Sequence, residues 1–368
     1  MNIKSLGWND EFESHLNSLN NDNYTPGRII REHRKIYIVE TEQGQLQAEV
    51  SGRFMHAAKC LSDFPAVGDW VALSVRPDEK RATIHARLPR KSSFSRKAVL
   101  SGSKKTDGGK TDEQVLAANI DKVFLVCGLD DNFNIRRIER YLSIAWDSGA
   151  NPVIVLNKAD VCPDVEACLE EVESVAIGVT ILTVSAIEGS GLDQLRTCIS
   201  PGKTAVFLGS SGVGKSTLIN RLLGEDRLDT GGVRIADSRG RHTTIHRELI
   251  VLPSGGIVID TPGLREIQAF GDEEGLSRTF SDIEELASHC RFADCQHQNE
   301  PGCAVRNAIS SGELDESRFN SYLKLQKELA HLERRKDVKA QRQLYRERDK
   351  KYRQHSRENN ELRKKGLA

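Results

Sequence analysis

The sequence contains no long hydrophobic run and no excess of charge of one sign. Its apolar stretches all fall short of the ~18 residues that a membrane-spanning helix needs. The first residues, MNIKSLGWNDEFESHL, lack the basic-then-apolar pattern of a signal peptide. Lys plus Arg and Asp plus Glu both number 53, so the net charge does not indicate the kind of partner. We therefore expect a cytoplasmic protein that does not bind membranes.

The length and composition are those of a globular protein with several domains. The 368 residues suffice for two or three domains, and 38% of them are hydrophobic and 29% charged. Five of the eight cysteines are scattered along the chain, and three lie close to one histidine. In a reducing compartment such a cluster indicates a metal site rather than disulfide bonds.

The N-terminal third divides into three segments. Residues 1–24 are polar and are expected to form a short helix or a loose arm, with an amphipathic pattern at Phe12, Leu16 and Leu19. Residues 25–92 hold short β-rich runs separated by Gly, Pro and Asp turns, which predicts a small barrel of four or five strands. Residues 93–118 are basic and rich in Gly and Ser, and we expect a linker or mobile loop there.

Strand and helix signals alternate from residue 119 to residue 278. Runs such as DKVFLVCG, PVIVLN, TAVFLG and GIVIDTPG predict strands, and amphipathic segments at 134–148 and 164–176 predict helices. The alternation predicts a mostly parallel α/β sheet with helices on both faces. Residues 279–330 are expected to form a helical metal-binding domain, and residues 331–368 a basic helical tail.

A phosphate-binding loop, GSSGVGKST, follows the strand TAVFL and precedes a helical stretch. Its glycines let successive N–H groups point at phosphates, and the helix N-terminus adds its positive end. We expect Lys215 to reach the β- and γ-phosphates and the Ser216 hydroxyl to hold Mg²⁺. The expected nucleotide contacts in this loop are Gly209, Ser210, Ser211, Gly212, Val213, Gly214, Lys215, Ser216 and Thr217.

The tetrapeptide Asn157-Lys158-Ala159-Asp160 has the chemistry of a guanine-reading loop. The Asp160 carboxylate can accept from both N1–H and N2–H₂ of guanine, and adenine offers no matching pair. The Lys158 stem can lie along the base, and Asn157 can brace the loop. Alone, the tetrapeptide also suits an ordinary loop. One helix and one strand downstream, Ser185 and Ala186 are placed so that a backbone N–H can contact guanine O6.

Two further segments match the sensors of a γ-phosphate. Asp260 ends the strand GIVID and can hold Mg²⁺ through water, and the Gly263 N–H can bind the γ-phosphate. Thr243 and Thr244 lie between this motif and the phosphate loop, and one of them should close over Mg²⁺, although the plain start of a strand also fits. Together the motifs predict one binding site for GTP and GDP.

Along the chain, the two base-reading motifs come first, the phosphate loop follows, and the two γ-phosphate sensors come last. In the usual order the phosphate loop comes first and the base reader last. All five loops lie at one end of one parallel sheet, so joining the original termini and opening the chain elsewhere leaves the core intact. The second switch, just after Gly263, is thereby followed directly by the cysteine-rich region. A shift of this switch that depends on the γ-phosphate can change the orientation of that region.

The permuted order, the preceding small barrel and the stretch CRFADCQHQNEPGC resemble the bacterial ribosome small-subunit-dependent GTPase A (RsgA) family, over about residues 25–330. The resemblance implies an all-β OB-type barrel, a circularly permuted α/β GTPase domain and a C-terminal helical zinc domain. It also implies GTP hydrolysis in late maturation of the 30S subunit, contact with 16S rRNA and stimulation by the 30S subunit. We expect a monomer. The alternative is a GTP-gated RNA-binding module in which hydrolysis is incidental.

The cysteine cluster supplies the complete ligand set of one structural zinc. Cys290, Cys295, His297 and Cys303 offer three thiolates and one imidazole, with no ligand position left open for catalysis. His289 is a spare candidate, but the family pattern favours His297.

Two features concern turnover and RNA. Many GTPases orient the attacking water with a Gln where this chain has Leu264, so slow intrinsic hydrolysis is expected. His242 resembles a family position proposed to be catalytic, although an ordinary loop histidine also fits. Residues 333–365 contain 14 basic and six acidic residues. This segment is either an RNA contact or a solvated helix.

Overall fold

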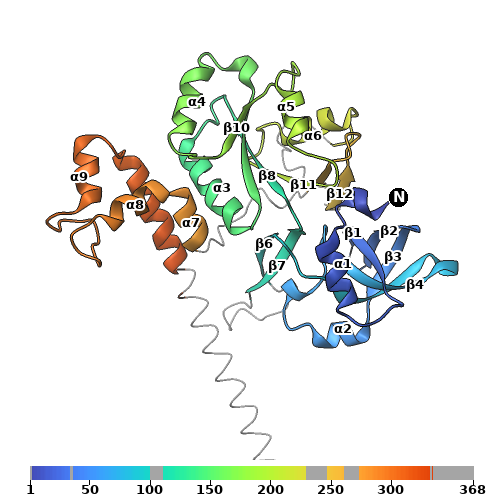
Figure 1. The fold of residues 1–368 in the computed structure, drawn as a ribbon. Helices are drawn as coiled ribbons and strands as arrows, with labels where there is room; N and C mark the ends of the chain where they lie inside the picture. Colours follow the sequence, from blue (N-terminus) through green and yellow to red (C-terminus); the bar gives the residue numbers. More distant parts are fainter. Residues whose placement is uncertain are drawn as a thin grey trace, which may run out of the picture. The chain divides into compact units, whose positions relative to one another are not determined.

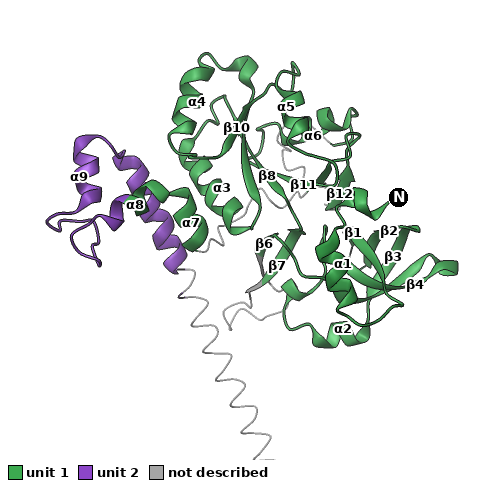
Figure 2. Cartoon of the chain, in the orientation of Figure 1, with its two compact units in different colours: residues 1–285 green, residues 286–368 purple. Residues whose placement is uncertain are grey.

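The computed structural model describes residues 2–33, 36–99, 111–228, 247–260, 273–331 and 334. The chain forms two compact units, residues 1–285 and residues 286–368 (Figure 2). The first unit holds both the barrel and the α/β sheet, and the second holds the cysteine cluster. The division falls inside helix α8 (Ser281–Ser288). Among the described residues, no helix is both long enough and apolar enough to cross a membrane.

The N-terminal arm is helical and packs on the barrel. A 3-10 turn (Ile3–Leu6) precedes helix α1 (Asp10–Asn17), whose first turn is capped by the Asn9 side chain accepting from the Phe12 N–H at 3.1 Å. The ring of Trp8 lies 4.7 Å from that of Trp70 in the barrel, and Phe12 lies 5.9 Å from it. The expected amphipathic helix is therefore present, although Leu19 beyond its end is exposed.

Five strands close into the N-terminal barrel (Figure 1). They pair in the order β1-β2-β3-β5-β4, β4 pairs back onto β1, and β3 runs parallel to β5. Alternating apolar residues build the interior, as in β3, where Leu46 and Ala48 are buried between exposed neighbours. The elements are β1 (Thr25–His33), β2 (Ile36–Thr41), β3 (Gly44–Val50), α2 (Gly52–Ala57), β4 (Trp70–Arg76) and β5 (Arg81–Arg87).

The segment after the barrel forms a two-stranded antiparallel ribbon of β6 (Ser93–Val99) and β7 (Thr111–Ala118). The expectation of a linker is therefore wrong at both ends of 93–118, and residues 100–110 lie outside the described parts. Phe94 pairs with Ala117 at one end of the ribbon, and the buried Phe94 and Leu116 anchor that end in the apolar core. The Gly- and Ser-rich composition between them conceals the strands in the sequence.

The α/β sheet has the order β10-β9-β8-β11-β13-β12, parallel except for β12. Side chains alternate between its faces. Leu125 packs in the apolar cluster that includes residues of helices α3 and α4, and Val126 packs in the cluster that includes residues of α5 and α6. Figure 1 labels these four helices around the sheet. The predicted helices on both faces are thus confirmed. The elements are β8 (Lys122–Gly128), α3 (Ile135–Asp147), β9 (Asn151–Asn157), α4 (Val165–Glu173), β10 (Thr180–Thr183), α5 (Leu192–Thr197), β11 (Thr204–Leu208), α6 (Lys215–Leu223), β12 (Glu248–Val251) and β13 (Ile257–Asp260).

The barrel and the α/β sheet are continuous because β1 pairs with β12, with Arg31 opposite Glu248. Their side chains also form an ion pair at 2.8 Å. Arg28 is fully buried at this junction and donates to Thr204 Oγ1 at 2.9 Å, to the Gly68 oxygen at 3.1 Å and to the Leu6 oxygen. Burial lowers the pKa of Arg28 to about 10, which leaves it charged at neutral pH. One guanidinium therefore ties the N-terminal arm, the barrel and the start of β11 together.

Three short helices, α7, α8 and α9, follow the second switch in the described part of the sequence. Helix α7 (Glu273–Thr279) packs on α3, where the Gly275 N–H donates to Asp147 Oδ1 at 2.9 Å. In the second unit, helix α9 (Ala304–Ser311) follows the cysteine cluster, and residues 316–331 form one further helix.

Candidate functional site

Four of the predicted nucleotide motifs lie where strands of the α/β sheet end. The phosphate loop follows β11, the guanine-reading loop follows β9, the Ser185-Ala186 pair follows β10, and Asp260 closes β13. The carboxyl ends of parallel strands share one edge of a sheet, which is where ligands bind in such folds. The topology therefore brings together segments that the sequence holds far apart.

The phosphate loop has the backbone and lysine geometry of its motif. Gly214 has a φ of 95°, and a Cβ there would lie 2.3 Å from Asn157 Nδ2, so no larger residue fits. Lys215 opens α6 and curls over the loop, donating to the oxygens of Gly209 at 2.8 Å and Ser210 at 2.6 Å. Its ammonium group thus lies against main-chain oxygens of the loop. Ser216 and Thr217 follow in the first turn of α6.

Asn157 joins three loops of the predicted site. Its Nδ2 donates to the Val213 oxygen in the phosphate loop at 2.8 Å, and its Oδ1 accepts from the Ala186 N–H at 3.1 Å. The side chain is buried, with 1% of the residue exposed. Both ends of the amide are used, so the side chain sets the spacing between the base-reading and phosphate-binding segments.

The carboxylate expected to read guanine is held in place before any base arrives. The buried Ser185 hydroxyl donates to Asp160 Oδ1 at 2.5 Å and accepts from the Glu188 N–H at 3.1 Å. Asp160 itself is exposed on a 3-10 turn (Ala159–Val161). The structure therefore gives Ser185 a positioning role toward Asp160, in addition to its expected backbone contact.

Lys158 has a partner that sequence reasoning missed. Its φ is 67°, and its Nζ lies 2.5 Å from Asp130 Oδ2 in the loop after β8. Burial favours the neutral form of Asp130, but hydrogen bonds from Lys158 and from the Asn132 N–H outweigh this and lower its pKa. The ion pair holds the lysine stem beside the guanine-reading loop. The signal available in the sequence was an acidic residue just after a strand of the same parallel sheet.

Arg137 is a second basic residue at the phosphate loop. It lies in the first turn of α3, and its Nη1 donates to Ser210 Oγ at 3.1 Å. No motif marks it, because its place depends on how α3 packs against β8 and β9. The predicted residues His242, Thr243, Thr244 and Gly263 lie outside the described residues, as does Leu264.

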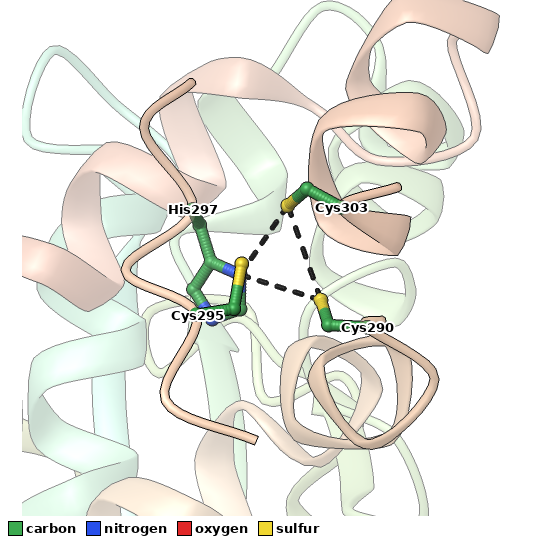
Figure 3. Close-up of side chains that lie close together, drawn as sticks. All are labelled: Cys290, Cys295, His297 and Cys303. Carbon is green, nitrogen blue, oxygen red and sulfur yellow. Dashed lines mark hydrogen bonds between the residues drawn. The ribbon is translucent and has the colours of Figure 1, made fainter. Parts of the chain in front are cut away.

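The four predicted metal ligands converge (Figure 3). One potential ligand atom from each of Cys290, Cys295, His297 and Cys303 lies within 4.8 Å of all the others. His297 Nδ1 lies 3.6 Å from Cys290 Sγ and 3.4 Å from Cys303 Sγ, and these two sulfurs are 3.9 Å apart. The neighbouring His289 is not one of these four converging residues, in agreement with the preference for His297 as the histidine ligand.

The surroundings favour the metal-binding protonation states of two ligands. Although burial opposes ionisation of Cys290, N–H groups of Val305 and Ala304 at the start of α9 contribute to a lowered pKa. Burial lowers the pKa of His297, which keeps its imidazole neutral. A thiolate and a neutral imidazole are the forms that coordinate a metal. The cluster can therefore hold a metal ion.

Comparison with known proteins agrees with this architecture. A family model described as RsgA GTPase matches residues 88–270. A model described as ABC transporter matches residues 192–360, a span that contains the phosphate loop but not the guanine-reading motif. The solved structure of YjeQ from Thermotoga maritima is 28% identical, with a TM-score of 0.59 over 83% of this chain and 99% of that chain. YloQ, titled a circularly permuted GTPase, is 25% identical with a TM-score of 0.59, over 84% of this chain and 96% of that one.

Curated relatives match nearly the whole chain. Small ribosomal subunit biogenesis GTPase RsgA of Opitutus terrae is 47% identical over 92% of both chains. Small ribosomal subunit biogenesis GTPase RsgA 2 of Lactiplantibacillus plantarum is 50% identical over 83% of both. Identity at this level over this length, together with the barrel, the permuted nucleotide loops and the Cys₃His cluster, establishes that the chain belongs to the RsgA GTPase family.

Proposed function

We propose that this chain is a GTP hydrolase acting in the late maturation of the small ribosomal subunit. The observation that carries the proposal is the single side chain of Asn157, which joins a preset guanine-reading loop to a phosphate loop. The relatives' printed names, small ribosomal subunit biogenesis GTPase, supply the biological setting. In this account Asp160 selects guanine, Lys158 lies along the base, and the Ala186 N–H contacts O6.

The phosphate end of the site would hold the triphosphate and its Mg²⁺. Lys215 would release the loop oxygens of Gly209 and Ser210 and turn to the β- and γ-phosphates. Ser216 and Asp260 would hold the Mg²⁺, directly and through water respectively, and the bound ion would neutralise charge that develops on the phosphates. The remaining positions of the loop, from Gly209 to Thr217, would contact phosphates mainly through main-chain N–H groups.

Hydrolysis would depend on residues that the subunit brings into position. Leu264 cannot orient water, so we assign that role to His242, with Thr243 or Thr244 over Mg²⁺ and the Gly263 N–H on the γ-phosphate. Holding a catalytic group in its reactive position is worth several kcal/mol, or roughly a hundredfold or more in rate. His242→Ala is expected to leave binding of GTP and of 30S subunits unchanged and to remove most of the stimulated rate.

The Cys₃His cluster would hold one structural zinc. Three sulfurs and one nitrogen at mutual distances within 4.8 Å suit tetrahedral coordination, and the complete ligand set leaves no position for a substrate. The zinc would therefore organise the second unit rather than take part in hydrolysis.

We propose that the partner of the chain is the 30S subunit, including its 16S rRNA. In this account the protein is a monomer and acts in the cytoplasm. In the barrel, α2 and its flanks contain no buried residue from 51 to 64, and they expose Arg53, Met55 and Lys59. Exposed cations beside apolar side chains suit contacts with phosphates and unstacked bases. The basic residues between 333 and 365 would add non-specific, salt-dependent affinity.

Sedimentation with purified 30S subunits tests this proposal. The chain loaded with a non-hydrolysable GTP analogue should co-sediment more strongly than the chain loaded with GDP. A version ending at residue 330 should bind more weakly, with a flatter dependence on salt. Equal binding in both nucleotide states would contradict a nucleotide-controlled factor. Nucleotide-dependent binding without any stimulation of turnover would favour the alternative, a GTP-gated RNA-binding module.

A further inference from the structure

Two thiols that the nucleotide site does not use flank the end of the guanine-reading loop. Cys162 follows the 3-10 turn that carries Asp160, and Cys168 lies on α4. Their sulfur atoms are 4.0 Å apart. Both side chains are half-buried and pack against the apolar core, so the two thiols remain partly accessible to solvent.

We propose that Cys162 and Cys168 are a modification site at which a small uncharged disulfide drives formation of a reversible intramolecular disulfide. The new bond would pull the 3-10 turn toward α4 and weaken GTP binding. The effect on affinity, but not the bond itself, rests on the proposed role of Asp160 in reading guanine.

The geometry decides which element moves. A disulfide brings its sulfurs to about 2.05 Å, so the pair must close by roughly 2 Å. Helix α4 is anchored by the Asp164 cap, which accepts from the Ala167 N–H at 3.0 Å, and by the fully buried Val172. The turn is held at its start by the Ala159 N–H, which donates to the Val184 oxygen at 3.2 Å. Its end is held more weakly, since the Cys162 N–H lies 3.4 Å from the Ala159 oxygen and Val161 is 60% exposed. Rotation of the two side chains supplies part of this closure, and the remainder displaces the end of the turn rather than the helix.

Displacement of the turn acts on the base reader. Asp160 lies two residues before Cys162, and its carboxylate is positioned by the Ser185 hydroxyl at 2.5 Å. Hydrogen bonds are steep functions of distance and angle, so a shift of an ångström or more at Cys162 would misplace the carboxylate. Loss of a charged hydrogen-bonding group in a binding site costs at least about tenfold in affinity.

The order of the thiol chemistry also follows from the surroundings. Burial, the contact with Cys162 and the negative charges of Glu171 and Asp164 raise the pKa of Cys168 to about 11. The first attack therefore falls to Cys162, whose thiolate displaces one thiolate from the oxidant and forms a mixed disulfide. Cys168 then loses its proton and attacks the Cys162 sulfur, releasing the second thiolate. Two protein thiols are oxidised to one disulfide, and the oxidant is reduced to two thiols.

The acidic neighbours select the oxidant. Glu171 and Asp164 repel an anionic reagent such as glutathione disulfide, whereas hydroxyethyl disulfide carries no charge. The competing interpretation is an apolar contact that merely anchors the start of α4, as hydrophobic residues flanking helix starts often do. That contact would require no reaction.

The test uses the full-length, zinc-loaded protein exposed to hydroxyethyl disulfide, followed by blocking of free thiols and peptide mass analysis. A 162–168 cross-link is expected, with the GTP Kd raised at least about tenfold and restored by dithiothreitol. The variant Cys162→Ser/Cys168→Ser should keep its affinity after the same treatment, and Cys198→Ser should respond like the parent.

Absence of the cross-link would overturn the proposal, and so would a cross-linked protein with unchanged GTP affinity. Faster reaction with glutathione disulfide than with hydroxyethyl disulfide would contradict the assigned role of the acidic neighbours. Equal binding of ATP and GTP by the reduced protein would instead defeat the guanine-reading role of Asp160, and the cross-link would still report on the thiols.

Discussion

The side chain of Asn157 donates to the main-chain oxygen of Val213 across 2.8 Å, although the two residues are 56 positions apart. This contact connects the guanine-reading loop to the phosphate loop. It depends on the neighbouring ends of parallel strands and not on which loop comes first in the chain. The reversed motif order therefore leaves the nucleotide site unchanged, while it places the second switch directly before the segment leading to the Cys₃His cluster.

Replacing Asn157 by alanine should destabilise the fold and weaken GTP binding. The change leaves the Val213 oxygen and the Ala186 N–H without their partner, at a cost of about 2–4 kcal/mol in the free energy of unfolding. Denaturant unfolding and calorimetric GTP titration measure the two effects. Asn151→Ala, at the exposed start of the same strand, is the matched control and should behave like the parent. A variant at 157 as stable as this control would refute the bracing role.

Asp160→Asn should convert the nucleotide preference from guanine to xanthine, because an amide can donate to the xanthine O2 where the carboxylate accepted from guanine N2–H₂. We expect GTP affinity to fall at least about tenfold and xanthosine triphosphate to bind better than GTP. Competition binding with both nucleotides provides the measurement. Asp164→Asn keeps the cap of α4 and should retain the preference for GTP. An unchanged preference in the 160 variant would exclude this residue as the base reader.

The pair formed by Asp130 and Lys158 should make stability depend on acid pH. The folded pKa of Asp130 lies below its ordinary value of 3.8, so its stabilising contribution is complete above about pH 4. It is lost as the pH falls through the lower, folded pKa. The stability difference between the parent and Asp130→Asn, from denaturant unfolding, should be constant from pH 5 to 7 and shrink at lower pH. A difference that grows on acidification would have the wrong sign.

Loss of the metal should affect the two units differently. Cys303→Ser removes the most buried of the four ligands, and we expect zinc content to fall and the segment around 286–311 to lose protection from proteolysis. GTP affinity should remain within about twofold, because all the described nucleotide-site residues lie in the first unit. Elemental analysis and limited proteolysis are the readouts, with Cys60→Ser as the control. Full zinc content in the 303 variant would contradict the ligand assignment.

The features that sequence reasoning predicted are those in which chemistry dictates residue type and spacing. The phosphate loop, Asn157, Asp160 and the Cys₃His cluster belong to this class. The structure adds contacts that depend on long-range packing. Arg28 resembles a surface residue in sequence, yet it is buried, and its partners include main-chain oxygens from two distant segments.

The strand pairings that were not predicted have the same origin. Closure of the barrel by β1 and β4 and its continuation into β12 depend on register between distant strands, which local patterns do not contain. The ribbon of β6 and β7 was hidden by its Gly- and Ser-rich connection. Arg137 likewise reaches Ser210 only because α3 packs beside the phosphate loop.

The turnover of GTP by the purified chain, with and without mature 30S subunits, tests the central claim most directly. Leu264 cannot orient water, so we expect slow hydrolysis by the chain alone. The subunit should raise the rate by at least about a hundredfold, because it would hold His242 in position at the γ-phosphate. ATP should not be hydrolysed under either condition. Turnover that 30S subunits leave unchanged, or equal hydrolysis of ATP and GTP, would contradict a guanine-specific GTPase controlled by the small ribosomal subunit.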